Sequence, residues 1–285
     1  MICVTGAGGT VGSEVVRQLE SAKAPFRAAY FSSAKMEAAR ARGIEAVRID
    51  YDRPETLLTA FHRCDRLFLL ANGLNQTQLE LNAVQAAKAA GMRHVVKLSV
   101  WGAEEEEFDF ARIHRPVEKA IGATGMASTF LRPNAYMQNV VTYMGDTIRA
   151  EGAFYSATGE AKISHVDVRD VAAVAVKALT EPGHEGKAYT LSGPEALTYA
   201  NLAAELSKAL ERPIRHVSLS PADLKGGMLA AGIPEEVADQ LLDLERYYRD
   251  NQASRITHDI QQVIGRAPRR FAQFADDCAP MLQSA

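Results

Sequence analysis

Three glycines near the start of the chain have the spacing of a phosphate-binding turn. Gly6, Gly9 and Gly12 stand in the run TGAGGTVG, at G-x-x-G-x-x-G spacing. Gly6 would let a strand turn, Gly9 would let the backbone approach a pyrophosphate, and Gly12 would let a helix pack closely on a strand. The N-terminus of that helix would offer free N–H groups to the phosphates. The run predicts dinucleotide contacts from Thr5, Gly6, Gly9, Thr10, Val11 and Gly12; a glycine-rich turn without a ligand is the alternative.

The end of the second expected strand bears on which nicotinamide dinucleotide binds. An acidic residue at this position would bind the ribose 2′-hydroxyl and repel a 2′-phosphate. The sequence instead has Phe31, Ser32, Ser33 and, two residues on, Lys35. We therefore favour NADPH over NADH, keep NADH open, and expect these four residues to contact the cofactor. A helix-capping role for Ser32 or Ser33 is the competing interpretation.

Other cofactor contacts are expected where later strands end. Small or polar residues at these positions would let the adenine, a ribose or the nicotinamide lie against the backbone, although each could equally be an ordinary turn residue. The predicted contacts are Asp50 and Tyr51 at the adenine, Ala71, Asn72 and Gly73 at a ribose, and Pro133 and Asn134 at the nicotinamide.

Alternating strands and helices would position these residues. The pattern predicts strands at 1–4, 26–31, 45–50, 66–71, 94–100 and 127–133, with helices from about 10, at 34–42, 54–62 and 76–90, and one ending near 125. Several strands are apolar on both faces, so we expect a doubly wound α/β domain of the Rossmann type over residues 1–150. Residues 151–285 are less regular, with helices near 168–180, 199–211 and 234–249 and a strand near 187–193. They predict a smaller α/β lobe that is interwoven with the first domain and binds substrate.

The composition of the chain argues against nucleic acid, a metal ion and a membrane as partners. The chain has 285 residues, 47% of them hydrophobic, and a formal net charge of −3, which gives no basic surface for nucleic acid. Cys3, Cys64 and Cys278 have no metal-ligand spacing, so we expect no metal and reduced thiols, as in a cytoplasmic protein. Neither a secretion leader nor an apolar run of about 20 residues is present, so no membrane contact is expected.

Five stretches together resemble one protein family. They are TGAGGTVG (5–12), IDYDRPETLLTAF (49–61), AAKAAGMRHVVKLS (86–99), FLRPNAYMQNV (130–140) and HVDVRDVAAVAVKAL (165–179). Over nearly the whole chain, they resemble the NmrA-like branch of atypical short-chain dehydrogenases/reductases, and most closely its bacterial NAD(P)H:quinone reductases, triphenylmethane reductases and flavin-free azoreductases. The resemblance implies a flavin-free NAD(P)H-dependent oxidoreductase. It also leaves open a non-catalytic NAD(P)-sensing regulatory protein, because the family contains such regulators.

The sequence departs from the family pattern after the second strand. Typical members place there an arginine that holds the 2′-phosphate, and this chain has Phe31, Ser32 and Ser33 instead. The ring of Phe31 could stack on the adenine, and use of NADH stays open for this reason.

The catalytic pair of ordinary short-chain dehydrogenases is also absent. Their Tyr-x-x-x-Lys pair falls by position on His114 and Glu118. His114 could act as a general acid because its ordinary pKa lies near neutrality; a solvated or capping histidine at a helix start is the alternative. Glu118 is expected to be structural, and zinc binding by the two is disfavoured because no third ligand is suitably spaced. Pro116 predicts that the helix begins or bends there, so that His114 and Glu118 would not share a face.

Without a catalytic phenol, simple alcohol dehydrogenation is disfavoured. Quinones, azo compounds and triarylmethane cations accept hydride at a delocalised centre and need only stacking against the nicotinamide. We therefore predict a reductase of a small conjugated aromatic electrophile, held in an apolar slot. The candidate slot residues are Trp101, Tyr136, Met137 and Asn139, with core packing as the alternative for Trp101. A homodimer is possible, without a residue-level case.

Overall fold

A parallel sheet forms the centre of the protein. The computed structural model describes residues 1–73 and 75–283, and over these residues seven strands pair in the order β3-β2-β1-β4-β5-β6-β8. Their bounds are β1 (Ile2–Val4), β2 (Phe26–Tyr30), β3 (Ala46–Arg48), β4 (Arg66–Leu69), β5 (His94–Leu98), β6 (Ala127–Pro133) and β8 (Lys187–Leu191). The order reverses between β1 and β4, which is the position at which open α/β sheets bind ligands. The predicted doubly wound α/β fold is confirmed.

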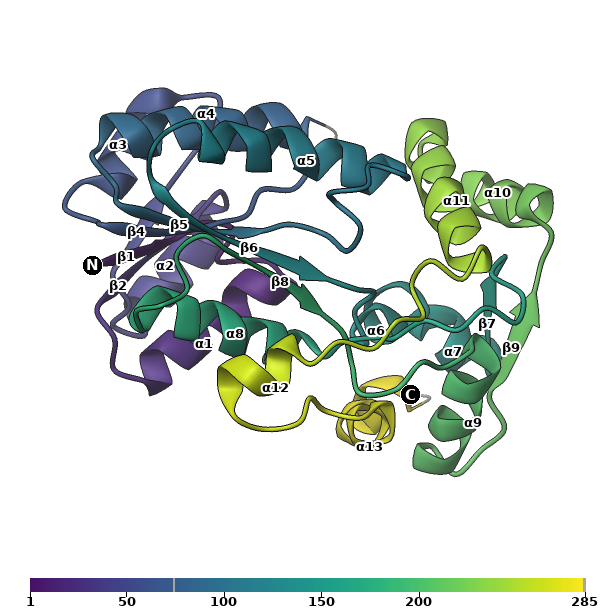
Figure 1. The fold of residues 1–285 in the computed structure, drawn as a ribbon. Helices are drawn as coiled ribbons and strands as arrows, with labels where there is room; N and C mark the ends of the chain where they lie inside the picture. The colour runs from purple at the N-terminus through teal and green to yellow at the C-terminus, as the bar shows by residue number, and fades with distance from the viewer. Residues whose placement is uncertain (74, 284–285) are drawn as a thin grey trace.

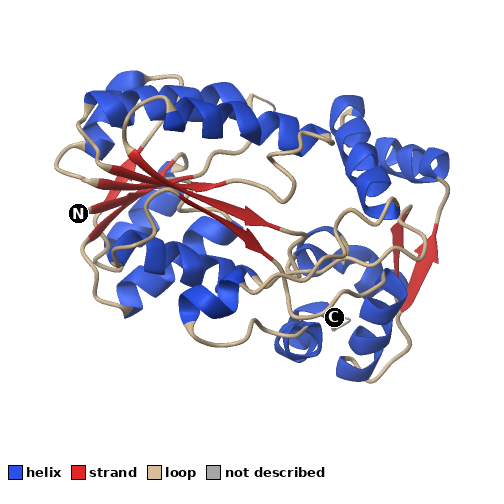
Figure 2. Ribbon diagram, in the orientation of Figure 1, coloured by secondary structure: helices blue, strands red, loops and turns tan. Residues whose placement is uncertain are grey.

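Helices cover both faces of the sheet (Figures 1 and 2). One face carries α3 (Pro54–Phe61), α4 (Gln76–Ala89) and α5 (Asp109–Gly122), and the other carries α1 (Thr10–Ser21), α2 (Ser33–Ala41), α8 (Val168–Thr180) and α12 (Asp259–Ile264). Each layer buries an apolar stripe that recurs at helical spacing. Val15 and Leu19 of α1 share one buried cluster with Val171 of α8, and Leu57 and Val117 lie in the cluster on the opposite face.

A second lobe lies beyond the carboxyl ends of the strands (Figure 1). Its short strands β7 (Ala153–Ser156) and β9 (Arg215–Ser218) pair in parallel. Its helices are α6 (Asn139–Tyr143), α7 (Gly145–Glu151), α9 (Tyr199–Ala209), α10 (Pro221–Ala230), α11 (Glu235–Arg249) and α13 (Phe271–Leu282). Because β8 and α8 return from this half of the chain to complete the central layers, the two lobes are interwoven. A boundary at residue 150 stays a prediction.

Helix α5 differs from the expectation drawn from Pro116. The helix runs from Asp109 to Gly122 with Pro116 inside it, so it does not begin at the proline. His114 therefore lies in the middle of the helix and is buried together with Glu118. Both side chains contact the sheet, since His114 meets Lys97 of β5 and Glu118 meets Arg132 of β6. The expectations of a solvated or capping histidine, and of two side chains on different faces, were wrong.

Candidate active site

The glycine turn joins β1 to α1 at the point where the strand order reverses. Gly6 has a φ of 62°, and a Cβ at this position would lie 2.9 Å from the carbonyl oxygen of Leu70. At Gly12, a Cβ would lie 2.0 Å from the carbonyl oxygen of Gly6, so helix and turn pack closely. No described side chain caps α1, whose N-cap is Gly9. The turn therefore leaves N–H groups of the first helical turn available to an anion.

A cavity of about 460 Å³ opens over this turn. The predicted cofactor residues that line it are Gly6, Gly9, Phe31, Ser32, Lys35, Asp50, Tyr51, Ala71 and Asn72. Gly8 also lines it, although the glycine spacing did not single it out. The hydroxyl of Tyr51 donates to the carbonyl oxygen of Leu70 at 2.5 Å, which fixes its ring against the end of β4.

Four predicted cofactor residues lie outside the described lining of the cavities at the site: Thr5, Gly12, Ser33 and Gly73. Thr5 is buried, and its hydroxyl oxygen lies 3.0 Å from the carbonyl oxygen of Phe68 and 3.0 Å from the N–H of Leu70. Thr5 therefore fixes the end of β4 rather than facing a ligand, and Gly12 shapes the turn from behind.

Lys35 is the only cation among the described residues that line this cavity. Its Nζ donates to the carbonyl oxygen of Gly8 at 2.8 Å, which places the ammonium group beside the glycine turn. The Ser32 hydroxyl accepts a hydrogen bond from the N–H of Lys35 at 3.4 Å and is the N-cap of α2. Ser32 therefore caps the helix and faces the cavity at once, so its two interpretations do not exclude each other.

A second cavity, of about 340 Å³, continues from the first, and the two share Leu70 and Asn72. The predicted residues that line it are Thr10, Val11, Pro133, Asn134, Trp101, Tyr136, Asn139 and His114. Asn134 is held in place, because its Nδ2 donates to the Ser164 hydroxyl and to the carbonyl oxygen of Ala253, both at 2.8 Å. Met137 is buried and outside the described lining, and its N–H donates to the carbonyl oxygen of Val166 at 3.0 Å.

Aromatic rings form much of the wall of this second cavity. Phe108 and Tyr247 stack with their centroids 4.3 Å apart, and the indole N–H of Trp101 donates to the carbonyl oxygen of Gln252 at 3.0 Å. Burial raises the pKa of the Tyr247 phenol to about 12, so the ring stays uncharged. Gly102 permits the close approach, since its φ is 68° and a Cβ there would lie 2.7 Å from the Tyr247 oxygen.

Sequence reasoning missed the contribution of α11 to this wall. Leu241, Leu244, Tyr247 and Tyr248 all line the second cavity from that helix. The helix itself was expected near 234–249, and the apolar spacing along it was visible. The signal that its apolar stripe faces a site rather than a core was absent from the local sequence.

A charged cluster lies behind His114. Lys97 and Glu80 are fully buried, with Lys97 Nζ 2.9 Å from Glu80 Oε1 and 3.0 Å from His114 Nδ1. Lys97 Nζ also donates to the carbonyl oxygen of Leu98, and Glu80 Oε1 accepts from the N–H of Ala71 at 3.1 Å. The cluster thus joins three elements, α4, β5 and α5, to the end of β4 that lines both cavities.

Burial shifts the pKa of every titratable group in this cluster. It lowers the pKa of His114 well below its ordinary value, and the nearby charge of Lys97 lowers it further. Burial also lowers the pKa of Lys97 and raises the pKa of Glu80, while their mutual attraction opposes both shifts. His114 is therefore a neutral imidazole at neutral pH.

Comparison with known proteins identifies the family of this chain. Residues 1–275 match the model of the NmrA-like family. The chain belongs to this family. It is 39% identical over 277 residues, 96% of each chain, to the NAD(P)H azoreductase of Xenophilus azovorans. It also matches the solved structure of the Escherichia coli NADPH-dependent quinone oxidoreductase complexed with NADPH at a TM-score of 0.88, with 29% identity over 97% of this chain and 99% of that chain. The structure of the Citrobacter sp. triphenylmethane reductase complexed with NADP(H) matches at the same TM-score, with 28% identity over 98% of this chain and 100% of that chain.

These matches confirm several predictions from the sequence. The NmrA-like family, the Rossmann-type fold, the oxidoreductase class and a nicotinamide cofactor were all expected. The structural role expected for Glu118 stays a prediction. Burial acts to raise the pKa of Glu118, but hydrogen bonds from Arg132 and Arg115 hold it below its ordinary value.

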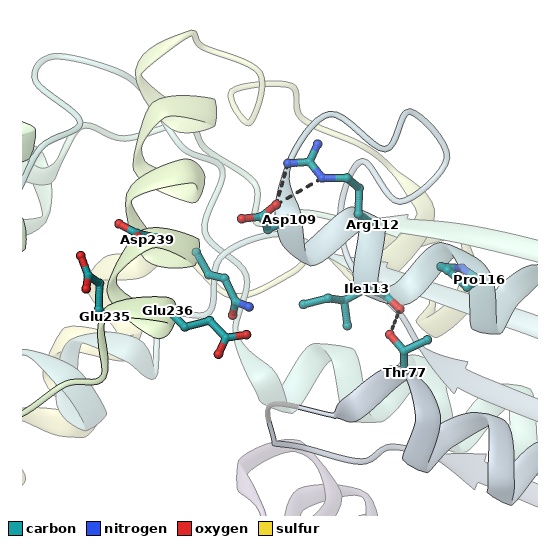
Figure 3. Close-up of a pocket in the computed structure, with 9 residues that line it drawn as sticks. Thr77, Asp109, Arg112, Ile113, Pro116, Glu235, Glu236 and Asp239 are labelled. Atoms are coloured by element: carbon teal, nitrogen blue, oxygen red, sulfur yellow. Dashed lines mark hydrogen bonds and ion pairs between the residues drawn. The ribbon is translucent and has the colours of Figure 1, made fainter.

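A larger cavity, of about 780 Å³, lies between α5 and α11, outside the aromatic wall (Figure 3). The side chains of Asp109 and Arg112 pair with each other at 2.7 Å, and the Thr77 hydroxyl donates to the carbonyl oxygen of Ile113 at 2.8 Å. Glu235, Glu236 and Asp239 line it from α11, and of these three the Glu236 side chain points toward α5. Neither the glycine turn nor His114 lines this cavity, so the two smaller, connected cavities are the candidate active site.

The described residues were also searched for a metal site, disulfides and membrane-spanning helices. Among the described residues, no group of three His, Cys, Asp or Glu side chains is arranged to hold a metal ion, and all three cysteines are free. No helix in the described ranges has the length and apolar character needed to cross a membrane. The absence of metal, flavin and nucleic acid, the cytoplasmic location and the homodimer stay predictions.

Proposed function

We propose that this protein is a flavin-independent reductase that transfers hydride directly from NADPH to a conjugated aromatic electrophile. The observation that carries the proposal is the continuity of the two cavities at the switch point of the sheet. One contains the glycine turn and the other an aromatic wall, and they meet at Leu70 and Asn72. A dinucleotide that spans both would lie with its pyrophosphate on the turn and its nicotinamide beneath the aromatic rings.

The first cavity fits a dinucleotide in shape and in charge. Both Gly6 and Gly12 occupy positions that a Cβ would fill, as a backbone cradle for a pyrophosphate requires. The first turn of α1 contains no acidic residue, so its partial positive charge is not neutralised locally. We assign dinucleotide contacts to the predicted residues that line the cavities, with Thr5 and Gly12 holding the turn in shape.

The second cavity fits a flat aromatic acceptor. Nicotinamide, when bound, supplies the hydride, and the walls formed by Trp101, Phe108 and Tyr247 would hold a planar molecule in contact with it. Asn139 and Tyr136 add polar atoms to the lining of this cavity, where they would orient a quinone oxygen or an azo nitrogen. His114 Nε2 would donate a hydrogen bond to the same heteroatom. The named activities of the relatives support this choice of acceptor.

Turnover by purified, flavin-free protein tests the proposal. Loss of the absorbance of NADPH or NADH is followed with menadione, an azo dye, malachite green and a simple ketone as acceptors. We expect oxidation of the cofactor with the three aromatic acceptors and none with the ketone. Tight binding of the dinucleotide without turnover of any acceptor would contradict the reductase and favour the NAD(P)-sensing regulatory protein.

Lys35 is proposed to set the preference for NADPH. Its ammonium group is the only cation among the described residues that line the first cavity, and a charged hydrogen bond to a 2′-phosphate is worth about 1.5–3 kcal/mol. Lys35→Met is expected to raise the KM for NADPH by about tenfold or more and to leave the KM for NADH unchanged. Steady-state kinetics with both cofactors measure this, with Lys88→Met, an exposed lysine at the end of α4, as the matched control. An equal rise for both cofactors would show that Lys35 does not read the 2′-phosphate.

A further inference from the structure

We propose that the buried pair of Lys97 and Glu80 fixes the tautomer of His114, so that His114 passes a proton from Lys97 to a heteroatom of the acceptor. The inference rests on the proposed function and deepens it by naming the source of the proton. His114 is the catalytic residue in this scheme, because it lines the cavity, and Lys97 and Glu80 act through it.

The contacts of Lys97 determine which nitrogen of His114 carries a proton. An ammonium group has three N–H donors and no acceptor, and Lys97 Nζ has three acceptors around it. They are Glu80 Oε1 at 2.9 Å, His114 Nδ1 at 3.0 Å and the carbonyl oxygen of Leu98. Because Lys97 can only donate, Nδ1 must accept, and a neutral imidazole then carries its proton on Nε2.

The Nε2 atom of His114 points toward another residue of the cavity lining. His114 lines the second cavity beside Gln76, whose side-chain amide nitrogen lies 3.5 Å from Nε2. Both ring nitrogens cannot accept at once, since such a ring would be an imidazolate. The Gln76 amide must therefore present its oxygen to the Nε2 proton, which a half-turn of the amide achieves. A substrate oxygen or nitrogen can replace that amide oxygen.

Glu80 holds the other end of the cluster in place. Its Oε1 atom accepts from Lys97 and from the N–H of Ala71, and Ala71 lines the first cavity. The carboxylate oxygen lies 2.9 Å from Lys97 Nζ and balances the charge of the ammonium group, although both side chains are fully buried. The proton donor is therefore anchored to the same strand end that would contact the cofactor.

For a quinone, the transfer of one proton must accompany the addition of hydride. Hydride addition leaves a negative charge on the quinone oxygen, and that oxygen forms a bond to the Nε2 proton as the Nε2–H bond breaks. An N–H bond of Lys97 breaks as the Nδ1–H bond forms, which leaves a neutral amine at Lys97. After product release, water gives a proton to Nε2 and Nδ1 returns its proton to Lys97, so each cycle takes one proton from solvent. A triarylmethane cation needs none of these steps, because hydride addition at carbon gives a neutral product directly.

The inference is tested by comparing a quinone, which needs the proton from His114, with a triarylmethane cation, which does not. We expect the double variant Lys97→Met/Glu80→Gln, which keeps the buried charge balanced, to lower the ratio of the kcat for menadione to the kcat for malachite green. A positioned acid contributes about 10²–10⁴-fold, so the ratio is expected to fall by about 100-fold or more. His114→Gln, which can donate but cannot relay a proton, should lower the ratio in the same direction.

Asp170→Asn is the matched control. It removes a fully buried carboxylate that pairs with Arg266 and Arg269 on the far side of the sheet, so it lowers stability without touching the cluster. The ratio of the two rates should be unchanged in this variant. Equal losses with both acceptors in Lys97→Met/Glu80→Gln and in His114→Gln would show that the cluster is only structural, and would overturn the inference.

A measurement that does not need turnover separates this inference from the proposed function. The ¹⁵N chemical shifts of His114 in the complex with NADP⁺ report which ring nitrogen is protonated. We expect a protonated Nε2 and a bare Nδ1, and a loss of this preference in Lys97→Met/Glu80→Gln. The opposite tautomer in the unaltered protein would overturn the inference even if all acceptors were reduced, whereas absence of turnover with the expected tautomer would contradict only the reductase.

Discussion

Gly12→Ala is expected to raise the dissociation constant for NADP(H) by at least about 100-fold, or about 2.7 kcal/mol. A Cβ at this position would lie 2.0 Å from the carbonyl oxygen and 2.6 Å from the carbonyl carbon of Gly6. Both neighbours are backbone atoms, so they can make room only if the whole turn moves away from α1. The displaced turn would no longer present its N–H groups to a pyrophosphate. Fluorescence titration with NADPH measures the loss.

A second glycine provides the control. Gly227 lies inside α10, and a Cβ there meets nothing within 4 Å. Gly227→Ala should bind NADPH as the unaltered protein does, and should raise the free energy of unfolding by up to about 1 kcal/mol, because glycine is a poor helix former. Unaltered NADPH binding by Gly12→Ala would show that the dinucleotide does not lie on this turn.

The fold could be predicted from the sequence because its signals are local. Apolar runs bounded by polar residues define the buried parallel strands, and the glycine turn has a spacing that few other structures require. The strand predicted at 127–133 and the helix predicted at 168–180 match β6 and α8. The short helices of the second lobe escaped notice, because α6, with five residues, is too brief to show a period.

The candidate site was harder to predict because it depends on contacts between distant segments. The strand predicted at 94–100 contains Lys97, but nothing in the local sequence pointed to its buried partner Glu80 on α4. Pro116 obscured His114, since a proline at the eighth position of a helix is rare, and the histidine was therefore expected at a helix start. Tyr247 reaches the site only because the second lobe folds over the sheet.

Glu118→Gln is expected to lower the free energy of unfolding by about 3 kcal/mol. Glu118 is buried and accepts hydrogen bonds from Arg132 at 2.8 and 3.0 Å and from Arg115 at 2.8 Å. The amide removes the charge while the Arg132 guanidinium stays largely buried, and an uncompensated buried charge is costly. In a chain of this size, the loss corresponds to a fall in Tm on the order of 6–12 °C. Glu104→Gln, which removes the exposed partner of Arg132, should cost less than about 1 kcal/mol.

The difference between Glu118→Gln and the unaltered protein should also depend on pH. Burial acts to raise the pKa of Glu118, but the arginine hydrogen bonds dominate and hold it below its ordinary value. A depressed pKa in the folded state means that the carboxylate stabilises the protein fully above the pKa it has in the unfolded chain, and that this stabilisation is lost as the pH falls through the folded-state pKa. Denaturant unfolding at neutral and acidic pH should therefore show the two proteins converging in acid. A gap that is constant with pH would mean that Glu118 contributes through its shape rather than through its charge.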